Sequence, residues 1–158
     1  MRHDMRRRDR ATTTEEAWKI LNNALYATVA MTGADGWPYA VTVSFARMGE
    51  KLYFHSALAG FKVDSLAADG RVCVTAVESQ HTLPDELSVA YRSAVGFGMA
   101  ELVTDAVERR EGLMALCKKY APDNPNNEKE CASCTRAYVY KITISELTGK
   151  TQIPDSEK

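Results

Sequence analysis

Residues 38–57 read PYAVTVSFARMGEKLYFHSA and predict a pair of neighbouring β-strands. In the first half, large apolar residues from Tyr39 to Phe45 alternate with small or polar ones. This period of two is typical of a strand whose faces meet different environments. Residues 48–50 form a tight connection, and residues 51–57 form the returning strand. We therefore expect antiparallel pairing, because a link this short cannot join parallel strands.

The same reading extends to the rest of the chain. Strands are expected at 26–31, 71–79, 91–103 and 137–149, in addition to 38–48 and 51–57. Helices are expected at 12–25, 61–69 and 106–120, and residues 80–87 and 121–127 are read as loops. Gly96 and Gly98 share one face of a strand, where something must approach the backbone closely. Because a small antiparallel sheet loses its edges on closing, we expect an α+β, mainly β, six-stranded antiparallel barrel with flanking helices.

Length and composition indicate one ordinary domain. The chain has 158 residues, a net charge of −1 and 45% hydrophobic residues. No apolar run reaches the length of a membrane span. The arginines of residues 1–10 are not followed by the apolar stretch of a secretory signal. We therefore expect a cytoplasmic protein with no membrane partner.

Four cysteines are present, and two of them form a lone CxxC at Cys131 and Cys134. A structural zinc site normally needs a second pair, and a thioredoxin-like site needs the motif at the start of a helix after a strand. Here the motif follows a polar loop. We expect incidental thiols and no metal site, with a metal or redox role as the alternative.

Residues 53–62, YFHSALAGFK, contain features that suit an anion. A strand ends near Ser56, Gly60 makes a turn, and Lys62 stands where the next helix begins. The first amides of a helix have no internal partner, and the helix dipole favours negative charge there. A phosphate could therefore be held by Ser56, Gly60 and Lys62. The alternative is an ordinary strand-to-helix connection in which Lys62 is solvated.

Five stretches together resemble a known family. They are MRRRDR (5–10), PYAVTVSF (38–45), YFHSALAGFK (53–62), RVCVTAV (71–77) and YRSAVGFGMAELVTD (91–105). In this order they resemble the pyridoxamine-phosphate-oxidase-like flavin-binding split-barrel family, and within it the nitroimidazole-resistance proteins. True pyridoxamine-phosphate oxidases also carry an arginine-rich strand pair. This chain has none, so the resemblance does not extend to that reaction.

The resemblance implies a six-stranded split barrel that forms a homodimer, with FMN bound in the cleft between the subunits. It places the flavin phosphate at Ser56, Gly60 and Lys62. The implied flavin-ring contacts are Ser44, Phe45, Phe54, His55 and Ala57, with Arg92 and Ser93 as secondary candidates. The predicted domain covers residues 13–150, between a basic arm (1–12) and a loose tail (151–158).

The resulting functional hypothesis is an FMN-dependent oxidoreductase. It would reduce a small nitroaromatic or quinone-like acceptor with electrons from NADH or NADPH. A flavin carries out such chemistry itself, so no catalytic triad is needed. His55 is the candidate catalytic residue, because an imidazole can donate a proton near neutral pH. The alternative for His55 is a strand histidine bonded to backbone.

Two other classes of protein stay open. A haem- or flavin-binding protein without turnover would use His55 as a possible ligand. A nucleic-acid-binding protein would use the basic arm, which contains Arg2, Arg6, Arg7, Arg8 and Arg10. The near-neutral net charge makes the second class the weaker alternative.

Overall fold

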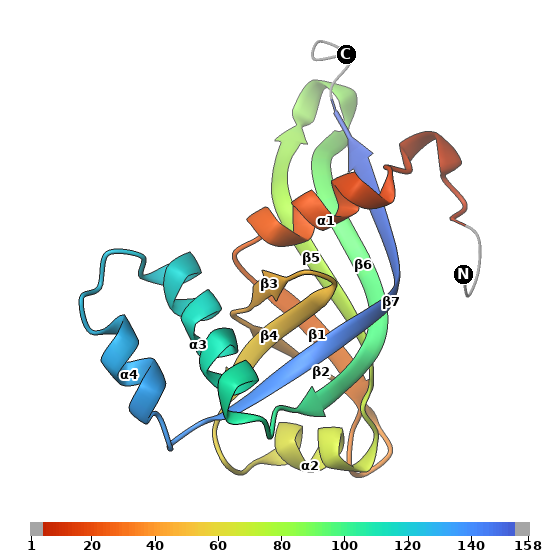
Figure 1. The fold of residues 1–158 in the computed structure, drawn as a ribbon. Helices are drawn as coiled ribbons and strands as arrows, with labels where there is room; N and C mark the ends of the chain where they lie inside the picture. Colours follow the sequence, from red (N-terminus) through yellow and green to blue (C-terminus); the bar gives the residue numbers. More distant parts are fainter. Residues whose placement is uncertain (1–4, 154–158) are drawn as a thin grey trace.

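The structure, a computed structural model, describes residues 5–153. These residues contain a seven-stranded antiparallel sheet in the order β2-β1-β5-β6-β7-β4-β3. The sheet curls on itself into an open barrel (Figure 1). The strands are β1 (Ala27–Thr32), β2 (Pro38–Val43), β3 (Ala46–Met48), β4 (Lys51–Ser56), β5 (Arg71–Leu83), β6 (Ser88–Leu102) and β7 (Tyr138–Gln152). The predicted α+β split barrel is confirmed.

The strand count differs because the strand predicted at 38–48 is broken at Ser44 and Phe45. Its first part, β2, pairs with β1, and its second part, β3, pairs with β4. At the break, the Phe45 N–H donates to the Tyr120 hydroxyl over 2.9 Å rather than to a neighbouring strand. The Tyr120 hydroxyl in turn donates to the Leu25 carbonyl over 2.6 Å. The two halves therefore lie on opposite edges of the sheet.

The hairpin of β5 and β6 is longer than predicted. Residues 80–83, read as loop, continue β5, and a short 3₁₀ helix, η2 (Pro84–Glu86), completes the turn. Further along β6, a Cβ on Gly98 would lie 2.2 Å from the Thr143 carbonyl oxygen of β7. The close approach expected at Gly98 is therefore made by the neighbouring strand, where the β6–β7 register shifts.

Four α-helices flank the sheet within the described part of the chain. They are α1 (Thr14–Asn23), α2 (Phe61–Ala68), α3 (Ala106–Tyr120) and α4 (Asn127–Ser133), and a 3₁₀ helix, η1 (Arg8–Arg10), precedes them. Thr13 and Asp105 cap α1 and α3 with their side chains. In Figure 1, α3 runs beside β3 and β4, with α4 outside it. α4 contains Cys131 and was not predicted.

The core divides at β4 because alternate residues face opposite sides of a strand. Leu52 and Phe54 point into the barrel, where they pack with α1 and the inner faces of the other strands. Tyr53 belongs to a second cluster, with Leu113 of α3 and Cys131 of α4. Since His55 follows Phe54, its side chain lies on the outer side with α3. This alternation decides which residues of β4 can meet a ligand.

The ends of the domain lie together. Thr12 N–H donates to the Gly149 carbonyl over 3.0 Å, and Ala11 bridges to Lys150. The loose tail is predicted to begin at residue 151. In the structure β7 continues to Gln152, which pairs with Tyr91 of β6. Arg2 of the predicted arm and residues 154–158 of the predicted tail lie outside the described residues. Among residues 5–153, no helix combines the length and the apolar character that a membrane crossing requires.

Candidate functional site

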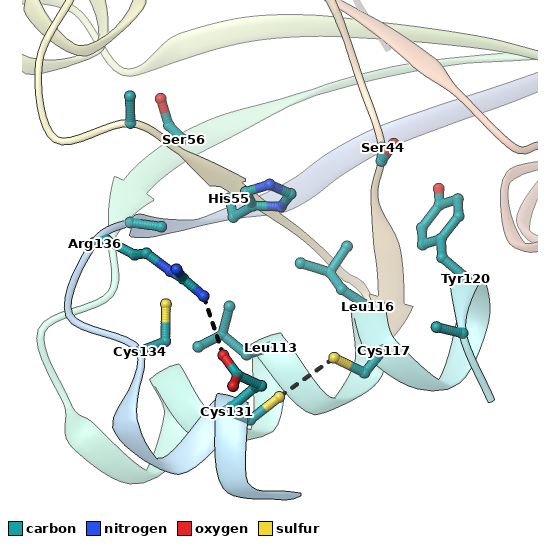
Figure 2. A pocket seen from close by; sticks show the side chains of 14 residues that line it. Ser44, His55, Ser56, Leu113, Leu116, Cys117, Tyr120, Cys131, Cys134 and Arg136 are labelled. Carbon is teal, nitrogen blue, oxygen red and sulfur yellow. Dashed lines mark hydrogen bonds and ion pairs between the residues drawn. The ribbon is translucent and has the colours of Figure 1, made fainter. Parts of the chain in front are cut away.

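A cavity of about 600 Å³ lies between the outer side of β4 and helices α3 and α4 (Figure 2). We call it the β4 pocket. It is lined by Ser44, His55, Ser56, Ala57, Leu113, Leu116, Cys117, Tyr120, Ala121, Glu130, Cys131, Cys134, Arg136 and Ala137. Its size falls in the range of small-molecule and cofactor sites.

Four of the residues predicted to contact a ligand ring or phosphate line the β4 pocket. His55 and Ser56 come from the end of β4, Ala57 directly follows it, and Ser44 comes from the break between β2 and β3. His55 is exposed and its imidazole lies in the pocket, whereas Ser56 is only 6% exposed (Figure 2). The strand end and the strand break therefore bring these residues together.

Phe45 and Phe54 point away from the β4 pocket. They are 1% and 0% exposed and belong to the barrel core. The Phe54 ring stacks on Tyr140 with centroids 5.4 Å apart. Lys119 Nζ lies 4.1 Å from the centroid of the Phe45 ring. Their side chains therefore do not face the β4 pocket, and only their backbone atoms could contact a ligand there.

The predicted phosphate-binding residues lie where β4 passes into α2. We call Ser56, Gly60 and Lys62 the α2 cradle. Gly60 precedes α2 with a φ of 128°, a conformation that favours glycine, and a Cβ there would meet nothing within 4 Å. The approach to the first turn of α2 is therefore open at this point.

The ammonium group of Lys62 lies near an aromatic ring of the barrel core. Its Nζ lies 5.6 Å from the centroid of the Phe54 ring. Burial lowers the pKa of the Lys62 ammonium from its usual value. Loss of hydration disfavours the charged form of the ammonium group, whereas a nearby anion would favour that form.

Ser65 fixes the position of α2 and was not predicted. Its hydroxyl is fully buried and donates to the Phe61 carbonyl over 2.6 Å. The same oxygen accepts from the Ala34 N–H over 3.0 Å, in the turn between β1 and β2. A serine inside a helix pattern gives no sign of such a partner, which lies 31 residues away in the chain.

Arg92 and Ser93 lie elsewhere. Arg92 Nε donates to Glu78 over 2.8 Å, and β6 pairs Arg92 with Thr151 of β7. The end of β6 near the β4 pocket is instead Leu102, paired with Tyr140. Within one chain, the structure does not bring Arg92 and Ser93 to the pocket.

The wall of the β4 pocket opposite β4 contains three thiols. Cys117 of α3 and Cys131 of α4 have their sulfur atoms 3.4 Å apart, and Cys134 lines the same cavity. Burial, with Cys117 as the next cause, raises the pKa of the Cys131 thiol to about 12. Arg136 donates to Glu130 over 3.1 Å at the same wall. In the described range 5–153, no group of three or more His, Cys, Asp and Glu side chains is arranged to hold a metal ion.

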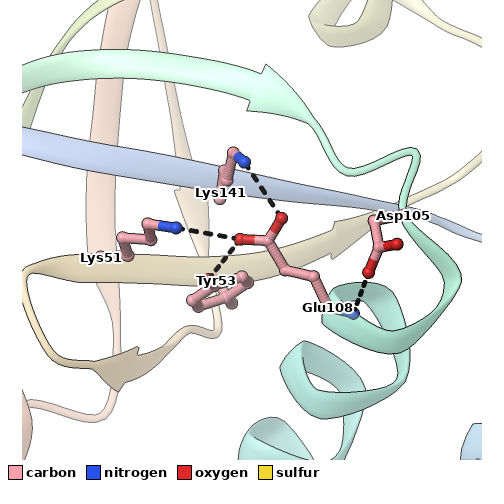
Figure 3. A network of polar contacts seen from close by, with 5 residues as sticks. All are labelled: Lys51, Tyr53, Asp105, Glu108 and Lys141. Carbon is pink, nitrogen blue, oxygen red and sulfur yellow. Dashed lines mark hydrogen bonds and ion pairs between the residues drawn. The ribbon is translucent and has the colours of Figure 1, made fainter.

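A charged network attaches α3, the helical wall of the pocket, to the sheet (Figure 3). The Glu108 carboxylate accepts from Lys141 over 3.0 Å, from Lys51 over 3.1 Å and from the Tyr53 hydroxyl over 2.8 Å. The hydrogen bond from Lys141 is the main cause that lowers the pKa of Glu108 to about 2, and Tyr53 adds to it. Burial, with Glu108 beside it, raises the pKa of Tyr53. The pocket wall is therefore anchored by groups that the ligand need not touch.

The curled antiparallel sheet with its flanking helices is an α+β split-barrel fold, and a ligand-sized pocket lies beside β4. The chain belongs to the pyridoxamine 5'-phosphate oxidase family, whose sequence pattern matches residues 13–151. The family expected from the sequence is thereby confirmed. The comparison with curated proteins found no match.

Solved structures with the same fold include three informative relatives. A candidate 5-nitroimidazole antibiotic resistance protein of Bacteroides thetaiotaomicron is 25% identical, with a TM-score of 0.75, over 89% of this chain and 85% of that one. It supports the expected subgroup. A FAD- and haem-binding protein of Mycobacterium smegmatis is also 25% identical, with a TM-score of 0.73, over 90% of this chain and 73% of that one. A flavocytochrome of Azotobacter vinelandii shares the fold at 23% identity and a TM-score of 0.77, over 96% of this chain and 73% of that one.

Proposed function

We propose that this chain is a flavoprotein that binds FMN and uses NADH or NADPH to reduce a small nitroaromatic or quinone-like acceptor. The observation that carries the proposal is the meeting of the β4 pocket with the α2 cradle at Ser56. The phosphate would bind at the cradle, and the isoalloxazine ring would lie in the pocket. The 25% identical relative from Mycobacterium smegmatis, which binds FAD and haem, supports a flavin. FMN is our choice from the resemblance to the nitroimidazole-resistance proteins.

The α2 cradle suits a phosphate on physical grounds. The first turn of α2 offers amides without helical partners and the positive end of the helix dipole. Gly60 leaves room for close approach, and Ser65 holds the helix in place. Lys62 adds a positive charge, and its partial burial lowers the pKa of its ammonium group. A phosphate beside Lys62 would replace the missing hydration with a charge-assisted contact.

The β4 pocket suits a ring with a reactive edge. The cavity wall formed by Leu113 and Leu116 is apolar, while Ser44 and His55 provide polar groups on the other side. A bound flavin supplies hydride and electron transfer, and the protein supplies orientation. His55 would hold a proton on a ring nitrogen and deliver it to the reduced acceptor. Ser44 would hydrogen-bond the ring edge through its hydroxyl.

A homodimer is part of the proposal. Leu25, Tyr26 and Val77 are 61%, 59% and 53% exposed and line one shallow depression on the outer side of β1 and β5. Neighbouring exposed apolar side chains of this kind mark contact surfaces. Arg92 bonds to Glu78, which lines the same depression. A second copy seated there would place Arg92 at the subunit interface, where it could reach the other subunit's ligand.

The direct test is titration of the purified full chain with FMN, FAD and riboflavin, followed by optical spectra and native mass spectrometry. We expect a yellow dimer with one FMN per chain. It should oxidise NADH or NADPH when a nitroaromatic or quinone is added. Preferential binding of FAD would correct the cofactor, and binding of no flavin would reject the function.

A second candidate function is haem binding without turnover, with His55 as an axial ligand. It is favoured by the exposed imidazole in a cavity of about 600 Å³ and by a relative described as binding both FAD and haem. Haem would give a strong Soret band that disappears in His55→Ala. In the flavin proposal, the same variant would keep the flavin spectrum and lose turnover.

A further inference from the structure

The thiols of Cys117 and Cys131 form a pair across two helices of the β4 pocket. Cys117 lies in the last turns of α3, and Cys131 lies in α4. Their sulfur atoms are 3.4 Å apart (Figure 2). Both line the cavity, and Cys117 is the one that a small solute in the pocket can reach, because Cys131 is buried. The CxxC spacing in the sequence suggests a different pair, Cys131 with Cys134.

We propose that Cys117 and Cys131 are a peroxide-oxidisable dithiol whose disulfide links α4 to α3. The contact geometry carries this assignment. A disulfide has an S–S length of about 2.05 Å, so the two sulfur atoms must approach by about 1.4 Å from their separation of 3.4 Å. A small shift of α4 or a rotation of the side chains can supply this.

The order of attack follows from exposure. Cys131 is 4% exposed and its raised pKa keeps it a neutral thiol at physiological pH. Cys117 is half-buried and is the more accessible of the two. The thiolate is the nucleophilic form of cysteine. Cys117 therefore reacts first with hydrogen peroxide, and Cys131 resolves the product.

The chemistry balances with hydrogen peroxide as the oxidant. The Cys117 thiolate attacks one peroxide oxygen, the O–O bond breaks, and hydroxide takes up a proton to leave as water. The Cys131 sulfur then attacks the sulfenic sulfur of Cys117. The S–S bond forms, the S–O bond breaks, and the hydroxide leaves as a second water with the Cys131 proton. Two thiols lose two electrons and two protons, and one peroxide becomes two waters.

The disulfide would restrain the wall of the pocket. α4 has seven residues, and polar contacts attach it and the residues after it to α3. Arg109 donates to the carbonyls of Cys134 and Ala137, and the exposed Arg110 pairs with Glu128. Exposed ion pairs contribute little. A covalent link at Cys131 would therefore be the strongest attachment of α4 and would limit its movement over the cavity.

Peptide mapping of the full chain after hydrogen peroxide tests the pairing and needs no flavin, so its outcome is independent of the proposed function. We expect two of the four thiols to be lost, a cross-linked Cys117–Cys131 peptide, and recovery of both thiols with a reductant. Cys134→Ser should retain the cross-link, and Cys117→Ser should abolish it. A Cys131–Cys134 link, oxidation of Cys117 without any cross-link, or four unreacted thiols would overturn the proposal.

Hydrogen exchange tests the restraint on α4. After oxidation, the amides of Asn127–Ser133 should exchange about tenfold more slowly in the wild type and in Cys134→Ser. Cys117→Ser treated in the same way should show no slowing. Unchanged exchange in a wild-type protein whose disulfide has been mapped would contradict the restraint.

Discussion

The hydroxyl of Ser65 accepts a hydrogen bond from the Ala34 N–H over 3.0 Å, which joins α2 to the turn between β1 and β2. The same hydroxyl donates to the Phe61 carbonyl at the start of α2. This buried serine therefore sets where the first turn of α2 stands. The position of the α2 cradle depends on it.

Ser65→Ala should destabilise the fold by roughly 1–3 kcal/mol, because it leaves the Ala34 N–H without its partner. Urea unfolding monitored by circular dichroism measures this change. Ser133→Ala is the matched control, since Ser133 also donates to a carbonyl four residues back but is exposed. The control should change stability by less than about 0.5 kcal/mol. Equal effects of the two variants would contradict the role of Ser65.

Glu108→Gln should lower stability at pH 7 by roughly 1–3 kcal/mol, because its charged hydrogen bonds to Lys51 and Lys141 are lost. The pKa of Glu108 is lowered to about 2 in the folded chain, against about 4.3 when unfolded. The ionised Glu108 carboxylate therefore contributes its full stabilisation at pH values above its pKa in the unfolded chain. This stabilisation is lost as the pH falls toward 2.

The difference in the free energy of unfolding between wild type and Glu108→Gln should therefore decrease progressively between pH 5 and pH 2. Glu111→Gln is the control, because Glu111 is an exposed residue on the same helix. Its free energy of unfolding should differ little from that of wild type at every pH. If the difference between wild type and Glu108→Gln stays constant over this pH range, the lowered pKa of Glu108 is contradicted.

Tyr120→Phe should destabilise the chain by roughly 1–3 kcal/mol, because the buried Phe45 N–H loses its acceptor. The ring is retained, so packing should change little. Tyr26→Phe, at a tyrosine that is 59% exposed, is the control. Thermal unfolding of both variants measures the difference. Retention of wild-type stability by Tyr120→Phe would show that the strand break does not depend on the hydroxyl.

The parts of the fold that the sequence predicts correctly depend on neighbouring residues. Alternation and Gly60 correctly indicated β4, the turn and α2, because strand period and helix start are set by neighbouring residues. The break at Ser44 was missed because the alternation continues through it. At this break the Phe45 N–H donates to the hydroxyl of Tyr120, which lies 75 residues away in the chain.

The same limit applies to the candidate site. The sequence predicts that His55, Ser56 and Ala57 lie together, because they are consecutive residues at the end of one strand. The pairing of Cys117 with Cys131 cannot be predicted from the sequence, because it depends on how α4 packs on α3, and no helix is predicted at 127–133. Arg92 was considered near the ligand on the resemblance alone, and one chain does not place it there.

Val77→Lys should convert the proposed dimer into a monomer, because it puts a charge into the apolar depression formed with Leu25 and Tyr26. Val107→Lys is the matched control, since Val107 is 66% exposed on α3, away from that depression. Native mass spectrometry and light scattering give the subunit count. A Val77→Lys protein that stays dimeric would place the interface elsewhere.

The most direct test of the account is the affinity of Lys62→Ala for FMN and for riboflavin, which lacks the phosphate. We predict that FMN binding weakens by roughly 10- to 100-fold, which corresponds to about 1.5–3 kcal/mol for a charge-assisted contact. Riboflavin binding should change little, and Lys19→Ala, at an exposed lysine, should leave both affinities unchanged. Unchanged FMN affinity in Lys62→Ala would contradict the phosphate site at the start of α2.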